Sequence, residues 1–282
     1  LWQKSIFDAL PDTIQRIINK LPCYLLNGLE EIRIRENRPL MIHSSGRDYL
    51  ISENGTCVHN PTSSYWITAD DTNKILQLIS DYSIYAFDEE IRNGYLTLRG
   101  GHRVGMSGKT VLENGQIRTM KYIKSFNFRI SREVIGAADK IMPFLSSGQN
   151  IRHTLILSPP QMGKTTLLRD IARKISDGFP GFKGMKVGIV DERSEIAGCW
   201  YGLPQKSVGM KTDILDGCPK AAGIMMMIRS MSPKVIITDE IGRAEDSAAI
   251  HEALNAGISI ITSAHAADIQ DALARPILSG LL

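Results

Sequence analysis

Gly163, Lys164 and Thr165 are the residues whose types and spacing point most clearly to chemistry. They follow an apolar stretch, residues 154–157, and open a stretch with helical spacing, residues 164–176. At such a turn, backbone N–H groups and the helix dipole can hold phosphate oxygens, while the lysine reaches the terminal phosphates and the threonine hydroxyl takes a position on Mg²⁺. The pattern predicts a phosphate-binding loop made of Ser158, Pro159, Pro160, Gln161, Met162, Gly163, Lys164, Thr165 and Thr166.

Ser158 stands where the full loop pattern has a glycine. That position mainly shapes the turn that leaves the strand. If its backbone needs a positive φ, a serine there costs on the order of 1 kcal/mol. We therefore expect the loop to bind nucleotide despite the substitution.

Two carboxylates end the apolar stretch "KVIITDE", residues 234–240. Asp239 can hold Mg²⁺ through water, and Glu240 can polarise an attacking water molecule, which is the division of labour that nucleotide hydrolysis needs. With the loop upstream, this predicts a Mg²⁺-dependent ATPase with Thr165 and Asp239 on the metal. The alternative is a nucleotide-binding scaffold without turnover, and an intact Glu240 disfavours it.

Two further apolar stretches end in polar side chains. "VGIVDERSE" ends in Asp191, Glu192 and Glu195, and "ISIITSAHA" ends in Ser263 and His265. Ligands of open α/β sheets bind where the strands end, so we expect these residues near the phosphate loop. Asp191, Glu192 and His265 thus join Glu240 as catalytic candidates, although a histidine at a strand end is often structural.

The two halves of the chain differ in pattern. In the second half, expected strands (154–157, 186–190, 235–238, 259–262) alternate with expected helices (164–176, 220–229, 244–256, 268–274), which predicts a parallel sheet covered on both faces. The first half mixes a helix over 2–21, broken at Pro11, and a helix over 69–80 capped by Thr68 with strands at 31–35, 40–44, 49–52, 94–109 and 115–131. We expect an α+β domain over residues 1–133 and an α/β domain over 134–282.

Composition sets wide bounds. The chain has 282 residues, of which 43% are hydrophobic and 22% charged, and a net charge of +3, too small to indicate nucleic-acid binding by itself. The four cysteines form no CxxC pair, so neither a disulfide framework nor a zinc site is expected. No apolar run approaches the roughly 20 residues of a membrane span, and no signal peptide is evident.

In this order, the motifs resemble the secretion ATPases, the ring motors of type II and type IV secretion and of type IV pili. The matching stretches are "SPPQMGKTT", "VDERSE", "VIITDE" and "EALNAGISIITSAHAAD". The resemblance implies a RecA-like P-loop NTPase core preceded by a smaller α+β domain. It also implies a homo-hexameric ring that acts on an inner-membrane channel or secretion subunit. Asp239, where the family usually has glycine, and Ser158 depart from its pattern.

Other stretches, among them "GGHRVGMSGK" and "SFNFRISRE", are similar to a family member of endospore-forming bacteria. That similarity implies a cytoplasmic protein on the mother-cell side, peripherally associated with the channel between mother cell and forespore. In the resembled family, arginines from the small domain complete a neighbour's site. The resemblance therefore makes Arg103 and Arg129 candidates for a catalytic role across an interface, with Arg132 behind them.

A nucleic-acid translocase or single-strand-binding ATPase is the alternative function, because RecA-like cores also drive such motors. It would want basic and aromatic residues together, and "KYIKSFNFRISR", residues 121–132, mixes them. A partly exposed strand explains the same residues, so nucleic acid is not the expected partner.

Overall fold

The computed structural model describes residues 2–80, 88–160 and 162–281. They form two compact units, Leu1–Arg132 and Glu133–Leu282. Each unit has a hydrophobic core of its own. The sequence placed the boundary one residue later, after residue 133.

The first unit begins with three short helices, α1 (Trp2–Phe7), α2 (Asp12–Asn19) and α3 (Cys23–Gly28). Pro11 has extended backbone directly before α2, which accounts for the expected break in the long helical pattern. Thr68 caps α4 (Ala69–Ile79): its side chain accepts the N–H of Asp71, whose carboxylate accepts the N–H of Thr68. A 3-10 turn (Pro61–Ser63) and α5 (Asp88–Asn93) complete the helices of this unit in the described residues.

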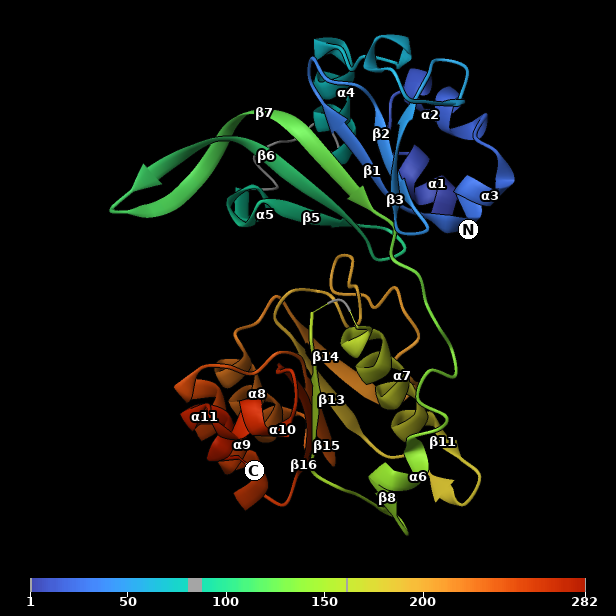
Figure 1. Ribbon diagram of the computed structural model, residues 1–282. Helices are drawn as coiled ribbons and strands as arrows, with labels where there is room; N and C mark the ends of the chain where they lie inside the picture. The colour runs from blue at the N-terminus through green and yellow to red at the C-terminus, as the bar shows by residue number, and fades with distance from the viewer. Residues whose placement is uncertain (1, 81–87, 161, 282) are drawn as a thin grey trace. The chain divides into compact units, whose positions relative to one another are not determined.

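A seven-stranded antiparallel sheet in the order β4-β3-β2-β1-β7-β6-β5 forms the rest of the first unit (Figure 1). One face carries core residues such as Ile32, Ile34 and Phe128, and Arg33 and Asn127 alternate with them along the strands. The strands are β1 (Leu29–Arg35), β2 (Met41–Ser44), β3 (Arg47–Ile51), β4 (Cys57–Val58), β5 (Tyr95–Leu98), β6 (His102–Glu113) and β7 (Gln116–Arg129).

The second unit is built on a parallel five-stranded sheet in the order β10-β16-β15-β13-β14. Helix α7 (Lys164–Asp177) packs through Ile171 against one face, beside Ile189 and Ile237. Helices α8 (Lys220–Ser230) and α9 (Ala244–Asn255) cover the other face, where Ile224 and Ile236 share a core (Figure 1). The strands are β10 (Thr154–Ser158), β13 (Val187–Asp191), β14 (Thr212–Asp216), β15 (Val235–Thr238) and β16 (Ser259–His265).

The predicted fold class is confirmed, and the structure adds elements that the pattern did not indicate. Strand β14 was not expected, because "TDILD" is half polar and lies at the sheet edge, where no continuous apolar run is required. Other short additions of the second unit are α6 (Met142–Leu145), β8 (Ser146–Ser147), β9 (Asn150–Ile151), β11 (Gly178–Phe179), β12 (Phe182–Lys183) and α11 (Pro276–Ser279). The last predicted helix is α10 (Ile269–Leu273).

Candidate nucleotide site

The expected phosphate loop lies between β10 and α7. Strand β10 ends at Ser158, and α7 begins at Lys164. Gly163 is the N-cap of the helix with φ 83°, a left-handed conformation that glycine adopts without strain. Gln161, one of the predicted loop residues, lies outside the described residues. The described loop therefore presents a helix N-terminus directly after a strand, as phosphate binding requires.

Ser158 is not strained. It pairs with His265 as the last residue of β10, and it is not among the described residues with positive φ. Because the backbone of residue 158 has no positive φ, a serine at this position carries no conformational penalty. Its hydroxyl donates to the carbonyl oxygen of Pro159 at 3.0 Å.

Lys164 connects the loop to the opposite side of the site. Its side chain is buried, and Nζ donates to the carbonyl oxygens of Ser158 (3.1 Å) and Pro159 (2.9 Å) and contacts His265 Nδ1 at 3.0 Å. Because an ammonium group has only donors, Nδ1 must accept, which places the imidazole proton on Nε2. That nitrogen lies 2.8 Å from Glu240 Oε1. Lys164, His265 and Glu240 thus form one series of polar contacts, with a hydrogen bond at Lys164 and a 2.8 Å contact at Glu240.

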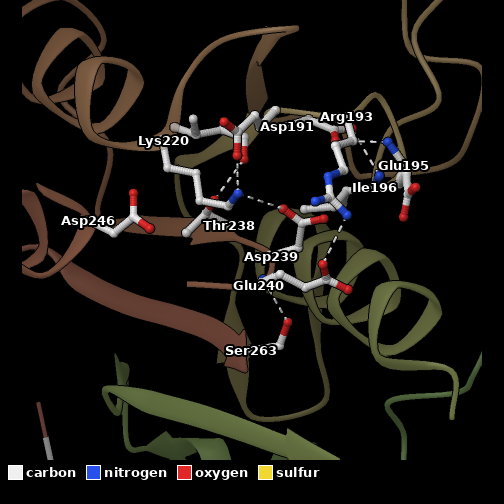
Figure 2. Close-up of polar contacts among 12 residues, drawn as sticks. Asp191, Arg193, Glu195, Ile196, Lys220, Thr238, Asp239, Glu240, Asp246 and Ser263 are labelled. Atoms are coloured by element: carbon white, nitrogen blue, oxygen red, sulfur yellow. Dashed lines mark hydrogen bonds and ion pairs between the residues drawn. The ribbon is translucent and has the colours of Figure 1, made fainter. Parts of the chain in front are cut away.

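The strand order explains how these residues meet. Strand β16 lies between β10 and β15, so its last residue, His265, stands between the ends of the other two strands. Ser263 of β16 accepts the N–H of Glu240 through its hydroxyl at 3.1 Å (Figure 2). Glu240 itself has φ 38°, an uncommon conformation outside glycine that often marks a functional position. Arg193 Nη1 lies 3.2 Å from the second carboxylate oxygen of Glu240.

Asp239 offers a buried oxygen. Its side chain is almost fully buried, and burial raises its pKa to about 6. Within the described residues, Oδ1 has no hydrogen-bond partner, and Lys220 Nζ lies 3.8 Å from it (Figure 2). Lys220 also pairs with Glu192. An unsatisfied carboxylate oxygen at the end of a strand suits a hard cation.

The described residues contain no cluster of three or more histidine, cysteine, aspartate or glutamate side chains that could hold a metal by themselves. Mg²⁺ does not require one, because it is usually bound by one or two side chains together with substrate phosphates. Asp239 and the half-buried Thr165 therefore fit that ion.

Asp191 supports the acidic turn that follows β13. Its carboxylate is fully buried and accepts the backbone N–H groups of Glu195, Ile196 and Ala197 at 2.8–2.9 Å. Burial raises the pKa of Asp191 to about 7, although the N–H groups of Ala197 and Glu195 oppose that shift. From α7, Arg169 donates to the carbonyl oxygens of Ile196 (2.5 Å) and Glu195 (2.7 Å). The acidic turn is thus fixed by Asp191 at the end of β13 and by Arg169 from α7.

The structure brings one group of predicted residues together at the carboxyl ends of the parallel strands: Lys164, Thr165, Asp191, Glu192, Asp239, Glu240 and His265. The arginine candidates belong to the first unit. Arg103 and Arg129 are directly opposite each other on β6 and β7. The Arg103 guanidinium lies over the Tyr95 ring, and Arg129 Nε lies 3.8 Å from Glu31. Arg132 donates to the carbonyl oxygen of Leu29 at 3.0 Å.

Three residues of the site were missed from sequence. Arg193 stands inside the "VDERSE" motif, so its position beside the catalytic candidates was a usable signal. Lys220 begins a helix, where lysine is normally exposed, and only the unpredicted β14 brings it to Asp239. Arg169 lies on the buried side of α7, and no sequence signal separates it from a surface arginine.

Comparison with known proteins identifies the family. The family model described as sporulation stage III, protein AA, matches residues 2–282. The chain belongs to that family. Stage III sporulation protein AA of Bacillus subtilis (strain 168) is 47% identical over 277 residues, which cover 98% of this chain and 86% of the relative.

Solved structures confirm the secretion-ATPase fold. The ATPase DotB of Legionella pneumophila superposes with a TM-score of 0.58 at 15% identity, covering 96% of this chain and 68% of DotB. The pilus retraction motor PilT, solved with bound ADP, gives 0.52 at 14% identity, covering 91% of this chain and 68% of PilT. In residues 2–80, 88–160 and 162–281, no helix has the length and apolar character that a membrane span requires.

Proposed function

We propose that this member of the sporulation stage III protein AA family is a Mg²⁺-dependent ATPase that works as a motor. One observation carries the proposal: the series of polar contacts from Lys164 through His265 to Glu240 at the carboxyl edge of the parallel sheet. It joins the residue suited to bind terminal phosphates to the residue suited to activate water.

Each residue has a role that follows from its contacts. The loop N–H groups and Lys164 bind and neutralise the phosphates, and Glu240 takes a proton from the attacking water. His265 and Arg193 orient the two carboxylate oxygens of Glu240. Asp191 accepts backbone N–H groups on both oxygens, so we assign it the positioning of the acidic turn.

Thr165 and Asp239 would hold the magnesium ion, which supplies positive charge against the phosphoryl oxygens as they develop negative charge. Glu192 supports this part of the site through Lys220, since Lys220 pairs with Glu192 and lies 3.8 Å from Asp239. The unsatisfied Oδ1 of Asp239 is the structural support for this assignment.

The motor role rests on similarity. DotB is an ATPase and PilT is a pilus retraction motor, and both share this fold. We propose a homo-hexameric ring on the cytoplasmic, mother-cell side of a sporulating bacterium, where it energises an inner-membrane channel or secretion subunit. In that ring, Arg103 and Arg129 would stabilise the transferred phosphoryl group in a neighbour's site, a contribution worth several kcal/mol.

Two substitutions test the hydrolytic site. Lys164→Ala removes the charge that binds the phosphates, so ATP binding should be lost. Glu240→Gln keeps the shape of the side chain but cannot accept a proton, so ATP should bind while turnover falls by at least about a hundredfold. Fluorescent-nucleotide binding and phosphate release measure the two effects. Glu252→Gln, an exposed carboxylate on α9, is the control. Native turnover by Glu240→Gln would contradict the assignment.

A mixing experiment tests the ring. If Arg129 acts across an interface, activity should rise more than linearly with protein concentration. Mixing Arg129→Ala protein with Glu240→Gln protein should restore part of the activity, because some interfaces then carry both intact groups. A mixture that assembles and stays inactive would show that Arg129 does not act in trans.

A further inference from the structure

A two-stranded arm extends from the sheet of the first unit. The arm comprises residues 107–122, the distal part of the β6–β7 hairpin (Figure 1). In the described part of the chain, β1 pairs with β7 only at residues 125–129, and β5 pairs with β6 only at residues 102–105. The arm therefore continues past the strands that flank it. Met120 packs against the core of the first unit, and Arg92 of α5 donates to the carbonyl oxygen of Arg118 at 3.2 Å, whereas none of the described core clusters includes a residue of the turn-proximal end, 112–117.

The end of the arm is apolar. Asn114 and Gly115 both have positive φ, at 50° and 77°, which makes a two-residue hairpin turn of the type that matches strand twist. Directly behind the turn, Leu112 and Ile117 face each other across the two strands. Their side chains are 63% and 44% exposed. We call these two residues the tip pair.

Positive charge lies behind the tip pair. Lys109 and Lys121 are directly opposite each other, an arrangement of like charges that destabilises a strand pair. Arg118 lies nearer the turn and pairs with Glu113 at 3.2 Å. Three basic residues and one acidic residue give the arm a net charge of +2. The facing lysines are both exposed, so this part of the arm presents positive charge to its surroundings.

Tyr122, which directly follows Lys121, has an exposed aromatic ring. It has φ 51°, a strained conformation for a bulky residue, and is 73% exposed. The register shifts at this point, where a Cβ on Gly108 would lie 2.7 Å from the carbonyl oxygen of Lys121. The bulge thus holds an aromatic side chain outside the sheet, beside the two lysines. Backbone strain at an exposed aromatic residue favours a function over a packing role.

We propose that the arm docks on an anionic lipid surface. An apolar end, cations behind it and an aromatic ring at the same level are the arrangement of segments that insert into the boundary between headgroups and acyl chains. The tip pair enters the acyl boundary, and Lys109 and Lys121 meet the lipid phosphates. A single-stranded nucleic acid would use the ring and the lysines but would leave the tip pair in water.

Sedimentation with vesicles tests this proposal on the full chain. Wild-type protein should bind vesicles of phosphatidylglycerol and phosphatidylcholine, and should bind pure phosphatidylcholine at least about tenfold more weakly. Leu112→Ser with Ile117→Ser should reduce binding to the anionic vesicles roughly tenfold. Lys109→Gln with Lys121→Gln should reduce it to a similar extent and flatten the salt dependence.

Matched controls are Ile269→Ser and Lys183→Gln, exposed residues of the second unit that should leave vesicle binding unchanged. Lys164→Ala protein should also bind vesicles like the wild type, so a failure of the ATPase proposal leaves this result intact. Circular dichroism confirms that each variant is folded. Binding that is equal on neutral vesicles, or that survives both arm variants, overturns the proposal. So does recruitment only by vesicles that contain membrane proteins, because the arm would then bind protein.

Discussion

Asp191→Asn separates a positioning role from a catalytic one. The carboxylate accepts three backbone N–H groups, one on Oδ1 and two on Oδ2. An amide of the same shape keeps one acceptor oxygen, so at best two of the three bonds survive. The third N–H then loses its acceptor and faces an NH₂ group inside the protein.

The size of the effect follows from those contacts. Losing a bond to a charged acceptor costs about 1.5–3 kcal/mol, and an unsatisfied buried donor adds a similar penalty. Burial of the charge in the native protein offsets part of this, since it raises the pKa of Asp191 to about 7. Because the burial penalty of the ionised side chain is largest above pH 7 and the Asn variant lacks it, we expect the second unit to lose only about 1–2 kcal/mol at pH 8. For a unit of this size that is a fall of roughly 5 °C in Tm.

Tryptophan fluorescence can report on the second unit alone. Trp200 lies in that unit close to the acidic turn, whereas Trp2 and Trp66 lie in the first. Urea unfolding in a Trp2→Phe, Trp66→Phe background therefore measures the stability of the second unit. Asp216→Asn is the matched control, because Asp216 stands opposite Asp191 and one of its oxygens accepts the Ser194 hydroxyl. An Asp191→Asn protein as stable as the wild type, yet unable to hydrolyse bound ATP, would refute the positioning role.

Two further predictions concern the phosphate loop and the metal ligand. Asp239→Asn should stabilise the nucleotide-free protein by about 1–2 kcal/mol above pH 6, because burial raises the native pKa of Asp239 to about 6. Between pH 4 and 6 the folded wild-type protein binds more protons than the unfolded protein. Wild-type stability therefore falls as the pH rises from 4 to 6, and the stability of the variant does not. Thermal unfolding from pH 4 to 8 measures this, with the exposed Asp268→Asn as control, and a gap between variant and wild type that does not grow with pH would contradict it. Ser158→Gly should change ATP affinity less than about threefold, since Ser158 lacks a positive φ and its hydroxyl contacts Lys164 only at 3.3 Å. A loss above tenfold in a nucleotide titration would mean that the hydroxyl contacts the nucleotide.

The fold of the second unit was predictable because its strands are buried on both faces. Residues such as Ile189 and Ile237 lie in continuous apolar runs, which are typical of strands buried in a parallel sheet. Strand β14 escaped prediction because an edge strand can be half polar, as Thr212 and Asp213 show. In the first unit, Thr68 and Asp71 predicted the start of α4, because helix capping depends on local hydrogen bonds and needs no tertiary contact.

The residues of the site also fall into those that local motifs predict and those that only the packing of distant elements brings in. Lys164, Asp239 and Glu240 lie in motifs whose spacing carries the chemistry, so the sequence points to them directly. Lys220 reaches Asp239 only through the path of β14 and α8, and spacing along the chain says nothing about that meeting. The same is true of Arg169, whose two acceptors lie more than 25 positions away. Long-range polar partners of this kind follow from the packing of elements, which the sequence pattern does not resolve.

If the site works as proposed, the contacts from Lys164 through His265 to Glu240 link phosphate binding thermodynamically to water activation. An anion that draws Lys164 Nζ away removes the donor from His265 Nδ1, and this changes the contact between the His265 imidazole and Glu240. Linkage is reciprocal, so whatever alters Glu240 must alter nucleotide affinity by the same coupling free energy. A neighbouring subunit or membrane partner that shifts this glutamate would therefore set how tightly the loop retains its nucleotide, without contacting the loop.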